Sequence, residues 1–241
     1  MLWPTLVLAV EAVLTVAGNV ITLLIFTKTP HLRVRKHVFI VNLAVADLLV
    51  GLISVPMYLY SLGYPFHDRR KKLVYKYAFT SQDVLLGTAS VCGLAAVAIE
   101  RVYATYCPFK HRTLSKTVYI IGIAVTWILA LTSGICSVFS LLLGYNLIFV
   151  LISPIILSLT SIFVSYTLIW IKVTCLSRVP NVALHHRRNK KLTVTLVIVT
   201  IVSLIAWISF QVSSINWHYS NRGELKLYTF FKNPPLWKLP R

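Results

Sequence analysis

The chain has 241 residues, of which 57% are hydrophobic and 12% are charged, and its 24 Lys and Arg against 6 Asp and Glu give a formal net charge of +18. Soluble domains carry about a quarter charged residues, so this composition excludes a soluble fold and predicts an integral membrane protein. The basic excess falls in polar connections, which favours loops beside lipid headgroups over nucleic-acid binding.

Apolar runs long enough to cross a bilayer recur along the chain. They cover about residues 2–26, 38–62, 83–109, 118–143, 146–171 and 192–217. The first run has no basic leader and contains Glu11 and Asn19, which argues against a signal peptide. In the second run, Pro56 is expected to kink the helix because it has no backbone N–H to donate. The sequence predicts an all-α integral membrane bundle of six transmembrane helices.

The domain organisation follows from where these runs stop. Residues 1–215 are expected to form the transmembrane bundle, and residues 216–241 an atypical basic tail that holds no run approaching twenty apolar residues. The connections after the first, third and fifth runs contain fourteen Lys and Arg, against ten on the other side. This bias favours a cytoplasmic location for the more basic side and an outside N-terminus.

The third run carries a line of polar residues. Asp83 and Arg101 are eighteen positions apart, which in a helix is five turns, about 27 Å, along one face. Ser90 lies about 20° off that line, between the carboxylate and the guanidinium. A charged side chain in lipid costs roughly 2.5 to 3.5 kcal/mol, so this face is expected to point into the protein.

Two further groupings follow from depth. Asn19, Asp47 and Ser90 all lie about 15 Å from the cytoplasmic ends of their runs, which predicts one polar cluster that a small cation would also satisfy. Asp83 and Trp207 both lie near the outer surface, where a carboxylate and an indole would attract a cation. The alternative for Asp83 is a structural ion pair or a hydrated carboxylate.

The order of several motifs resembles the rhodopsin-like (class A) G-protein-coupled receptors over about residues 8–215. The motifs are GNV at residues 18–20, NLAVAD at 42–47, ERV at 100–102, Trp127, and Pro108 followed by Phe109. The resemblance implies a seven-helix receptor fold, of which this chain supplies six helices, and a multi-pass protein of the plasma membrane rather than an enzyme.

The resemblance also implies roles for single residues. Glu100 would restrain Arg101 until activation frees it for a heterotrimeric G protein, which Pro108 and Phe109 would also contact. Asn19, Asp47 and Ser90 match the central polar network, where sodium binds in many members; a sodium ion at Asp47 is the one metal or cofactor implied.

The stretch around Asp83 is similar to the third helix of biogenic-amine receptors, in which an aspartate pairs with the ligand ammonium. The expected ligand is therefore a small molecule, with an amine as the favoured class. Trp207, and Asn146 near the outer end of the fifth helix, complete the expected ligand site. The fifth helix lacks the serine cluster of catechol binders.

Departures from the family pattern concern the outer surface and the end of the chain. Lys76 stands where most members have a cysteine, and Ser209 replaces the proline of the sixth helix. No seventh helix follows, which leads us to expect a C-terminally truncated receptor. Such a chain offers two alternatives to signalling: retention in the endoplasmic reticulum, or modulation of full-length receptors by association with them.

Functions from other classes are also weighed. A six-span transporter or channel would use intramembrane acids too, but it is expected to show an internal repeat, and none is evident. An intramembrane protease would need paired aspartates or a serine–histidine dyad at one depth. Asp47 and Asp83 differ in depth by about 12 Å, which argues against a protease.

Overall fold

The computed structural model describes residues 2–28, 37–63, 68–143 and 148–176, together with the single residues 201, 205, 208 and 212. Within these ranges the chain is almost entirely helical and contains no strand. The chain divides into two units, residues 1–202 and 203–241, and all the elements below belong to the first. In order, they are α1 (Leu2–Lys28), α2 (Val38–Leu49), the π-helical turn η3 (Val50–Ser54), α3 (Val55–Gly63), α4 (Arg69–Tyr106), α5 (Pro108–Thr113), α6 (Lys116–Leu143) and α7 (Ile148–Leu176).

Helical segments in the described ranges account for five candidate membrane spans. They are Thr5–Lys28, Val38–Leu62, Arg70–Tyr106, Lys116–Leu143 and Ile152–Lys172. These correspond to the first five predicted spans, and the all-α membrane fold is confirmed. The predicted sixth span, apart from four single helical positions, and the predicted tail lie outside the described residues.

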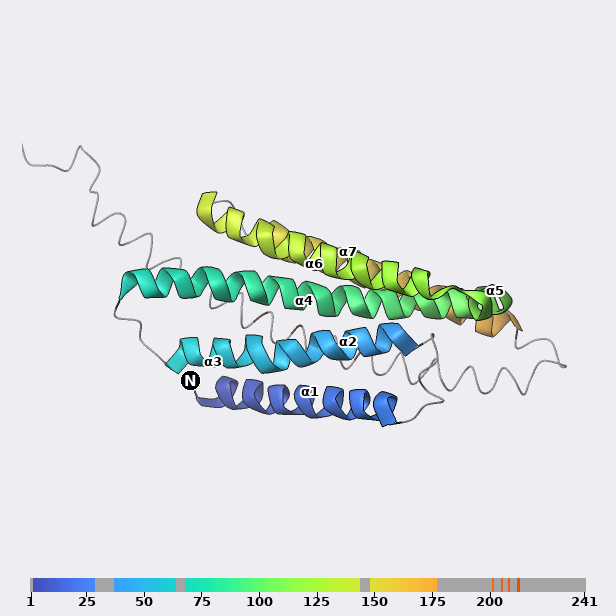
Figure 1. Ribbon diagram of the computed structural model, residues 1–241, viewed down its shortest axis with the longest axis horizontal. Coiled ribbons are helices and arrows are strands. Elements are labelled where there is room, and N and C mark those ends of the chain that lie inside the picture. Colours follow the sequence, from blue (N-terminus) through green and yellow to red (C-terminus); the bar gives the residue numbers. More distant parts are fainter. Residues whose placement is uncertain are drawn as a thin grey trace, which may run out of the picture. The chain divides into compact units, whose positions relative to one another are not determined.

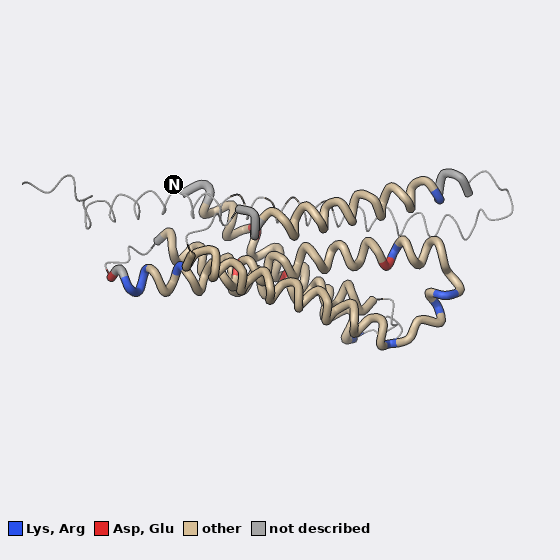
Figure 2. Tube along the Cα trace, turned by 90° about the horizontal axis from the view of Figure 1, so that it is seen from above, with Lys and Arg blue, Asp and Glu red and all other residues tan. Residues whose placement is uncertain are grey.

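Charged side chains are distributed as a bilayer requires. Lys and Arg gather at the ends of the described helices, and long stretches between those ends carry no basic residue (Figure 2). Among the described residues, the acids that lie within helices are Glu11, Asp47, Asp83 and Glu100. Carboxylates at these depths are costly against lipid, so their surroundings indicate where the protein is polar inside.

Helix α4 occupies the centre of this unit. It packs against α2 and η3 on one side and against α6 and α7 on the other, while α1 packs on α2, η3 and α3 (Figure 1). Over an apolar stretch of 18 residues in α4, 78% is buried, whereas the corresponding stretch of α1 is 6% buried. The helix that carries Asp83 and Arg101 is therefore the most enclosed of the five.

Both ends of α4 differ from the sequence prediction. The helix begins at Arg69, where the Asp68 side chain accepts a hydrogen bond from the Arg70 backbone N–H at 2.9 Å, so Lys76 belongs to the helix and not to the preceding connection. Asp68 acts as an N-cap, which satisfies one of the free amides of the first turn. At the other end α4 stops at Tyr106, because Pro108 disfavours a helical conformation at Cys107.

The helix that contains Pro56 widens into a π-helical turn just before the proline, whereas the predicted kink stays a prediction. In η3, the Val55 backbone N–H donates to the Val50 carbonyl, five residues back. A proline one residue later cannot donate, and its ring would press on the carbonyl four residues before it. The wider π-helical turn relieves the steric contact between the proline ring and that carbonyl.

Small residues allow α2, α4 and α6 to approach closely. Ala46, Ala89 and Ala130 are each at most 2% exposed and form one cluster, against which Leu85 and Trp127 pack. Between membrane helices, close van der Waals packing replaces the hydrophobic effect as the source of stability. This contact fixes the rotation of α2 relative to α4, and with it the direction of the polar side chains discussed below.

Candidate functional site

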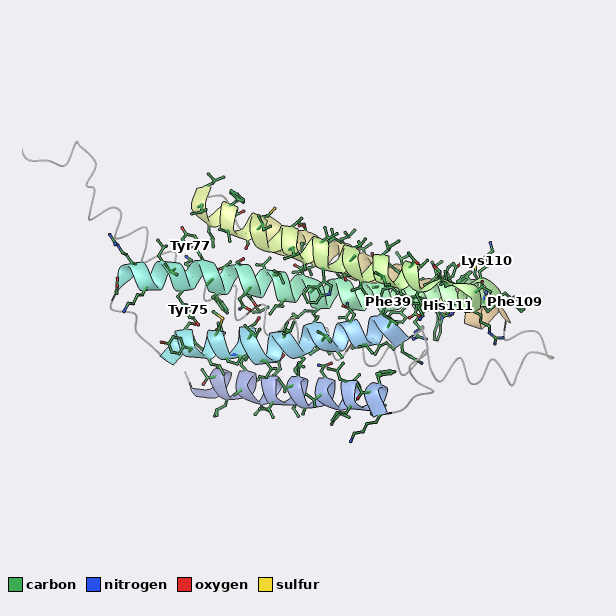
Figure 3. The ribbon with its side chains drawn as sticks, viewed as in Figure 1. Phe39, Tyr75, Tyr77, Phe109, Lys110 and His111 are labelled. Atoms are coloured by element: carbon green, nitrogen blue, oxygen red, sulfur yellow. The ribbon has the colours of Figure 1, made fainter. Side chains whose placement is uncertain are left out.

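The polar line along α4 is continuous in the structure. Because α4 is helical without interruption from Arg69 to Tyr106, Asp83 and Arg101 lie five turns apart on one face, about 27 Å from each other. Figure 3 shows the two ends of this helix: Tyr75 and Tyr77 lie near its start, and Phe109, Lys110 and His111 lie just beyond its end. The candidate site has three parts along α4, which we name by the sidedness predicted from the sequence: an outer part at Asp83, a central part at Ser90 and a cytoplasmic part at Arg101.

The outer part is built around Asp83, which is only 2% exposed. The sequence predicts that Asp83 lies near the outer surface; in the structure it is enclosed, and α4 extends fourteen residues before it. Beside it, the Ser54 hydroxyl of η3 donates to Oε1 of Gln82 at 3.1 Å. The predicted companions of Asp83, Trp207 and Asn146, lie outside the described residues.

Aromatic side chains from α3 and α4 lie on the outer side of Asp83. The ring centroid of Phe79 is 6.2 Å from that of Tyr58 and 6.4 Å from that of Tyr75, with the latter pair nearly parallel. The Tyr75 hydroxyl also donates to the Met57 backbone carbonyl. Rings of this kind present π faces to which a cation is attracted, so their position beside a buried carboxylate suits a cationic guest.

The central part contains two of the three predicted residues. The Ser90 hydroxyl of α4 donates to a carboxylate oxygen of Asp47 on α2. Asn19 instead donates its side-chain N–H to the Thr15 carbonyl of its own helix, at 2.9 Å. Asn19 thus bonds within its own helix, and among the described residues the hydrogen bond of the predicted cluster joins Asp47 and Ser90.

A second bond at this level was not predicted. The Trp127 indole N–H of α6 donates to Oδ1 of Asn42 on α2 at 2.9 Å. Both residues belong to motifs noted in the sequence, but a motif does not show which side chains meet. Spanning two helices, this bond holds α6 in register with α2 and with the Asp47–Ser90 pair.

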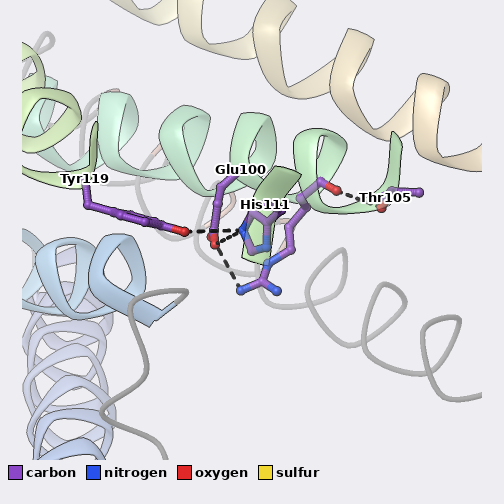
Figure 4. A network of polar contacts seen from close by, with 5 residues as sticks. Glu100, Thr105, His111 and Tyr119 are labelled. Atoms are coloured by element: carbon purple, nitrogen blue, oxygen red, sulfur yellow. Dashed lines mark hydrogen bonds and ion pairs between the residues drawn. The ribbon is translucent and has the colours of Figure 1, made fainter. Parts of the chain in front are cut away.

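The cytoplasmic part centres on Glu100, which is 5% exposed. Its Oε2 lies 3.5 Å from Nη2 of Arg101, and its Oε1 lies 3.2 Å from Nε2 of His111 on α5 (Figure 4). The Tyr119 hydroxyl of α6 lies 3.4 Å from the same His111 nitrogen. The predicted Glu100–Arg101 contact is present, and it belongs to a larger network that the sequence did not reveal.

Helix α5 presents two of the predicted contact residues to the outside. Pro108 occupies its first turn, where a missing N–H costs nothing, and the Phe109 side chain is 83% exposed. Figure 3 shows Phe109 at the end of the described bundle that also carries Lys110. Phe109 and the basic Lys110 are thus both exposed on this short helix.

Lys172 of α7 hydrogen-bonds to the C-terminal end of α4. Its ammonium donates to the carbonyls of Thr105 and Tyr106 at 2.7 and 3.3 Å, and lies 4.5 Å from the centre of the Tyr106 ring. The Tyr106 hydroxyl in turn donates to the Leu168 carbonyl at 2.9 Å. A cation on the last carbonyls complements the negative end of the helix dipole, so this contact supports the segment that carries Arg101.

A cavity of about 620 Å³ lies between α4, α6 and α7 and reaches this network. Its walls are largely apolar, with Ala95, Ile99, Val125 and Leu157 among the lining residues, and Glu100, Tyr103 and Tyr119 also border it. Neither Asp83 nor Asp47 does. The cavity is thus separate from the outer and central parts of the site.

Comparisons with known proteins agree with this arrangement. The family profile described as 7 transmembrane receptor (rhodopsin family) matches residues 18–143, more than half of the chain. The 5-hydroxytryptamine receptor 2C of Pan troglodytes is 31% identical over 130 residues, which cover 54% of this chain and 28% of that receptor. The histamine H2 receptor of Homo sapiens is 35% identical over 146 residues, which cover 59% and 38%. The chain thus spans well under half the length of these curated relatives.

Proposed function

We propose, on the premise that this chain belongs to the rhodopsin family of seven-transmembrane receptors, that it binds a small amine at Asp83 and acts on a heterotrimeric G protein through the cytoplasmic end of α4. Membership of this family makes the chain a multi-pass membrane protein of receptor type and not an enzyme or a transporter. The plasma membrane is its proposed location, with retention in the endoplasmic reticulum as the alternative.

One observation carries the proposal: a single buried helix joins an enclosed carboxylate at one end to an acid–arginine pair at the other. Glu100 holds Arg101 at 3.5 Å, and the exposed Phe109 follows after one break in the helix. A ligand that moves α4 or its neighbours would therefore alter the surface offered to a G protein. Arg101, Pro108 and Phe109 are the proposed contacts, and Glu100 restrains the arginine.

An amine suits Asp83 for electrostatic reasons. The two relatives are named as receptors for 5-hydroxytryptamine and histamine, and both of these ligands are amines. A protonated amine beside a carboxylate that is 2% exposed forms a charge-assisted hydrogen bond screened little by water. Trp207 and Asn146 remain the proposed further contacts of the ligand.

The Asp47–Ser90 pair is the proposed sodium site. Carboxylate and hydroxyl oxygens are hard ligands of the kind that a small cation prefers. A cation here would neutralise a carboxylate that lies at membrane depth, which lowers the cost of burying it. Asn19 remains part of this proposal, although its amide bonds within α1.

The test uses the full chain in lipid nanodiscs with purified G protein. Nucleotide exchange is measured with and without a panel of amines, and binding of each amine is measured directly. We expect Asp83→Asn to weaken amine binding by at least about 100-fold, since a charge-assisted bond in an enclosed site is lost. Asp68→Asn is the matched control, because Asp68 is an exposed N-cap on the same helix.

Coupling is tested separately from binding. Arg101→Ala is expected to abolish nucleotide exchange and to leave amine binding within a few-fold of the unmodified chain, with Arg112→Ala as the control. Equal exchange by Arg101→Ala and the unmodified chain would refute the coupling proposal. A chain that binds amines but exchanges no nucleotide would instead support the non-signalling role, in which it associates with full-length receptors.

A further inference from the structure

We infer that His111 is a positioning residue for Arg101: by competing for Glu100 in a proton-dependent way, it makes the coupling surface responsive to cytoplasmic pH. This inference rests on the proposed coupling through Arg101 and adds a regulator to that site. His111 lies on α5, outside the membrane-spanning helices, where protons of the cytoplasm would reach it.

Two basic residues, here called the two bases, contact the same carboxylate. Arg101 approaches Oε2 of Glu100 at 3.5 Å, while Nε2 of His111 approaches Oε1 at 3.2 Å (Figure 4). Glu100 is 5% exposed, so water screens its interactions little. A change in the charge of either base therefore alters the hold of the carboxylate on the other.

The two bases differ in how they respond to pH. The guanidinium of an arginine is always charged, whereas histidine is the side chain whose ordinary charge change falls between about pH 5 and 8. A protonated His111 would donate a charge-assisted hydrogen bond to Glu100 and would also repel the neighbouring guanidinium. Both effects weaken the restraint on Arg101, so acid favours its release.

Tyr119 gives the neutral form of His111 a second option. Its hydroxyl lies 3.4 Å from Nε2, the nitrogen that also faces Glu100. In one neutral tautomer Nε2 donates to Glu100, and in the other it accepts from Tyr119; the protonated ring only donates. Loss of the proton therefore divides His111 between two partners and leaves Glu100 more available to Arg101.

The surroundings of His111 make the sign of the effect clear. Among the described residues, the titratable or charged groups that face it are Glu100, Arg101 and Tyr103 from α4 and Tyr119 from α6, and Lys110 and Arg112 flank it on α5. Glu100 supplies the one carboxylate in this set. A proton on His111 is thus balanced by Glu100 at the expense of Arg101.

The same contact links pH to the exposed surface of α5. This helix has only six residues, and the bond from His111 to Glu100 holds it against α4. Phe109, two residues before His111, is 83% exposed on the same short helix. A stronger His111–Glu100 pair therefore frees Arg101 and steadies Phe109 at once, and both residues belong to the proposed G-protein contact.

The first test measures basal nucleotide exchange by the full chain in nanodiscs at about pH 6 and about pH 8, a range over which histidine titrates. At each pH, the exchange rate measured with the Arg101→Ala variant is subtracted from the rate measured with the unmodified chain. This removes the pH dependence of the G protein itself. We expect exchange to be roughly three- to tenfold faster at the lower pH, the difference between a charge-assisted and a neutral hydrogen bond. His111→Gln should abolish this ratio, whereas Arg112→Gln, next to it on α5, should retain it.

The second test reads the pair without a G protein. In the full chain labelled with ¹⁵N-histidine, the His111 signal is identified by its loss in His111→Gln. We expect Glu100→Gln to shift this signal, and more strongly at the lower pH. A signal unmoved by Glu100→Gln, or a pH ratio of exchange that survives His111→Gln, would overturn the inference. Unaltered exchange in Arg101→Ala would instead refute the coupling proposal, and the labelled signal would then still decide whether His111 pairs with Glu100.

Discussion

Gly134 of α6 lies close against α4, so adding a single methyl group there tests how tightly the two helices are packed. A Cβ at this position would lie 3.1 Å from the Ser81 backbone carbonyl oxygen and 3.1 Å from Cβ of Leu85. Ordinary van der Waals contacts of a Cβ lie at about 3.4 to 4.0 Å, so the neighbouring atoms of α4 would have to move by a few tenths of an ångström. The Ser81 hydroxyl, which reaches the Gly134 carbonyl at 3.4 Å, would lose that weak hydrogen bond.

The magnitude follows from two opposing contributions. Overpacking a well-packed site costs about 1 to 3 kcal/mol, and replacing glycine by alanine in a helix recovers up to about 1 kcal/mol. The net effect of Gly134→Ala therefore ranges from about 0 to about 3 kcal/mol of destabilisation, and we expect about 1 to 2 kcal/mol. Gly18→Ala is the matched control, because no atom of the described residues lies within 4 Å of its new Cβ, and it should stabilise by up to about 1 kcal/mol.

Both variants are compared with the unmodified chain by thermal unfolding in one detergent. For a chain of this size, 1 kcal/mol corresponds to about 2 to 4 °C, so the two alanine variants should shift the midpoint in opposite directions. If Gly134→Ala unfolds at or above the midpoint of Gly18→Ala, the close approach of α6 to α4 is wrong. If both variants lowered the unfolding midpoint equally, neither helix propensity nor the contacts of the new Cβ would explain the change in stability.

Three further predictions concern contacts within the site. Trp127→Phe, which keeps the ring and removes the N–H that Asn42 accepts, should cost about 0.5 to 1.7 kcal/mol in thermal unfolding; a double-mutant cycle with Asn42→Ala that shows no coupling would contradict this. Phe109→Ala should leave the unfolding midpoint unchanged, since the side chain is 83% exposed, while G-protein activation falls by about tenfold or more. Lys172→Met should lower stability by about 1 kcal/mol, and Lys172→Arg should recover part of it, because the cation on the Thr105 carbonyl is then restored.

The extents of the membrane spans and the relative positions of residues along one helix were largely predictable from the sequence. The length of an apolar run decides whether a helix can span a bilayer, and five predicted spans recur in the structure for that reason. Asp83 and Arg101 share one helix, so their spacing alone determined that they lie on one face. Asp68 was the sequence signal that α4 begins earlier than predicted, because it is a good N-cap residue. The basic residues that follow it are too polar for a search by hydropathy to include them in the span.

Contacts between helices were decided only by the tertiary structure. Residues at one depth do not meet unless each helix is rotated toward the other: Ser90 reaches Asp47, whereas Asn19 turns to its own helix at Thr15. His111 follows Glu100 by eleven residues, which in one straight helix would set them about 16 Å apart. The break at Cys107 redirects the chain into α5 and allows the two side chains to meet, and no local pattern shows that direction. Rotation and packing depend on many small contacts at once, such as the Ala46 cluster, and no local pattern records them. The sequence by itself therefore determined the membrane helices and the line of polar residues along α4, and the packing of those helices decided which polar residues form pairs.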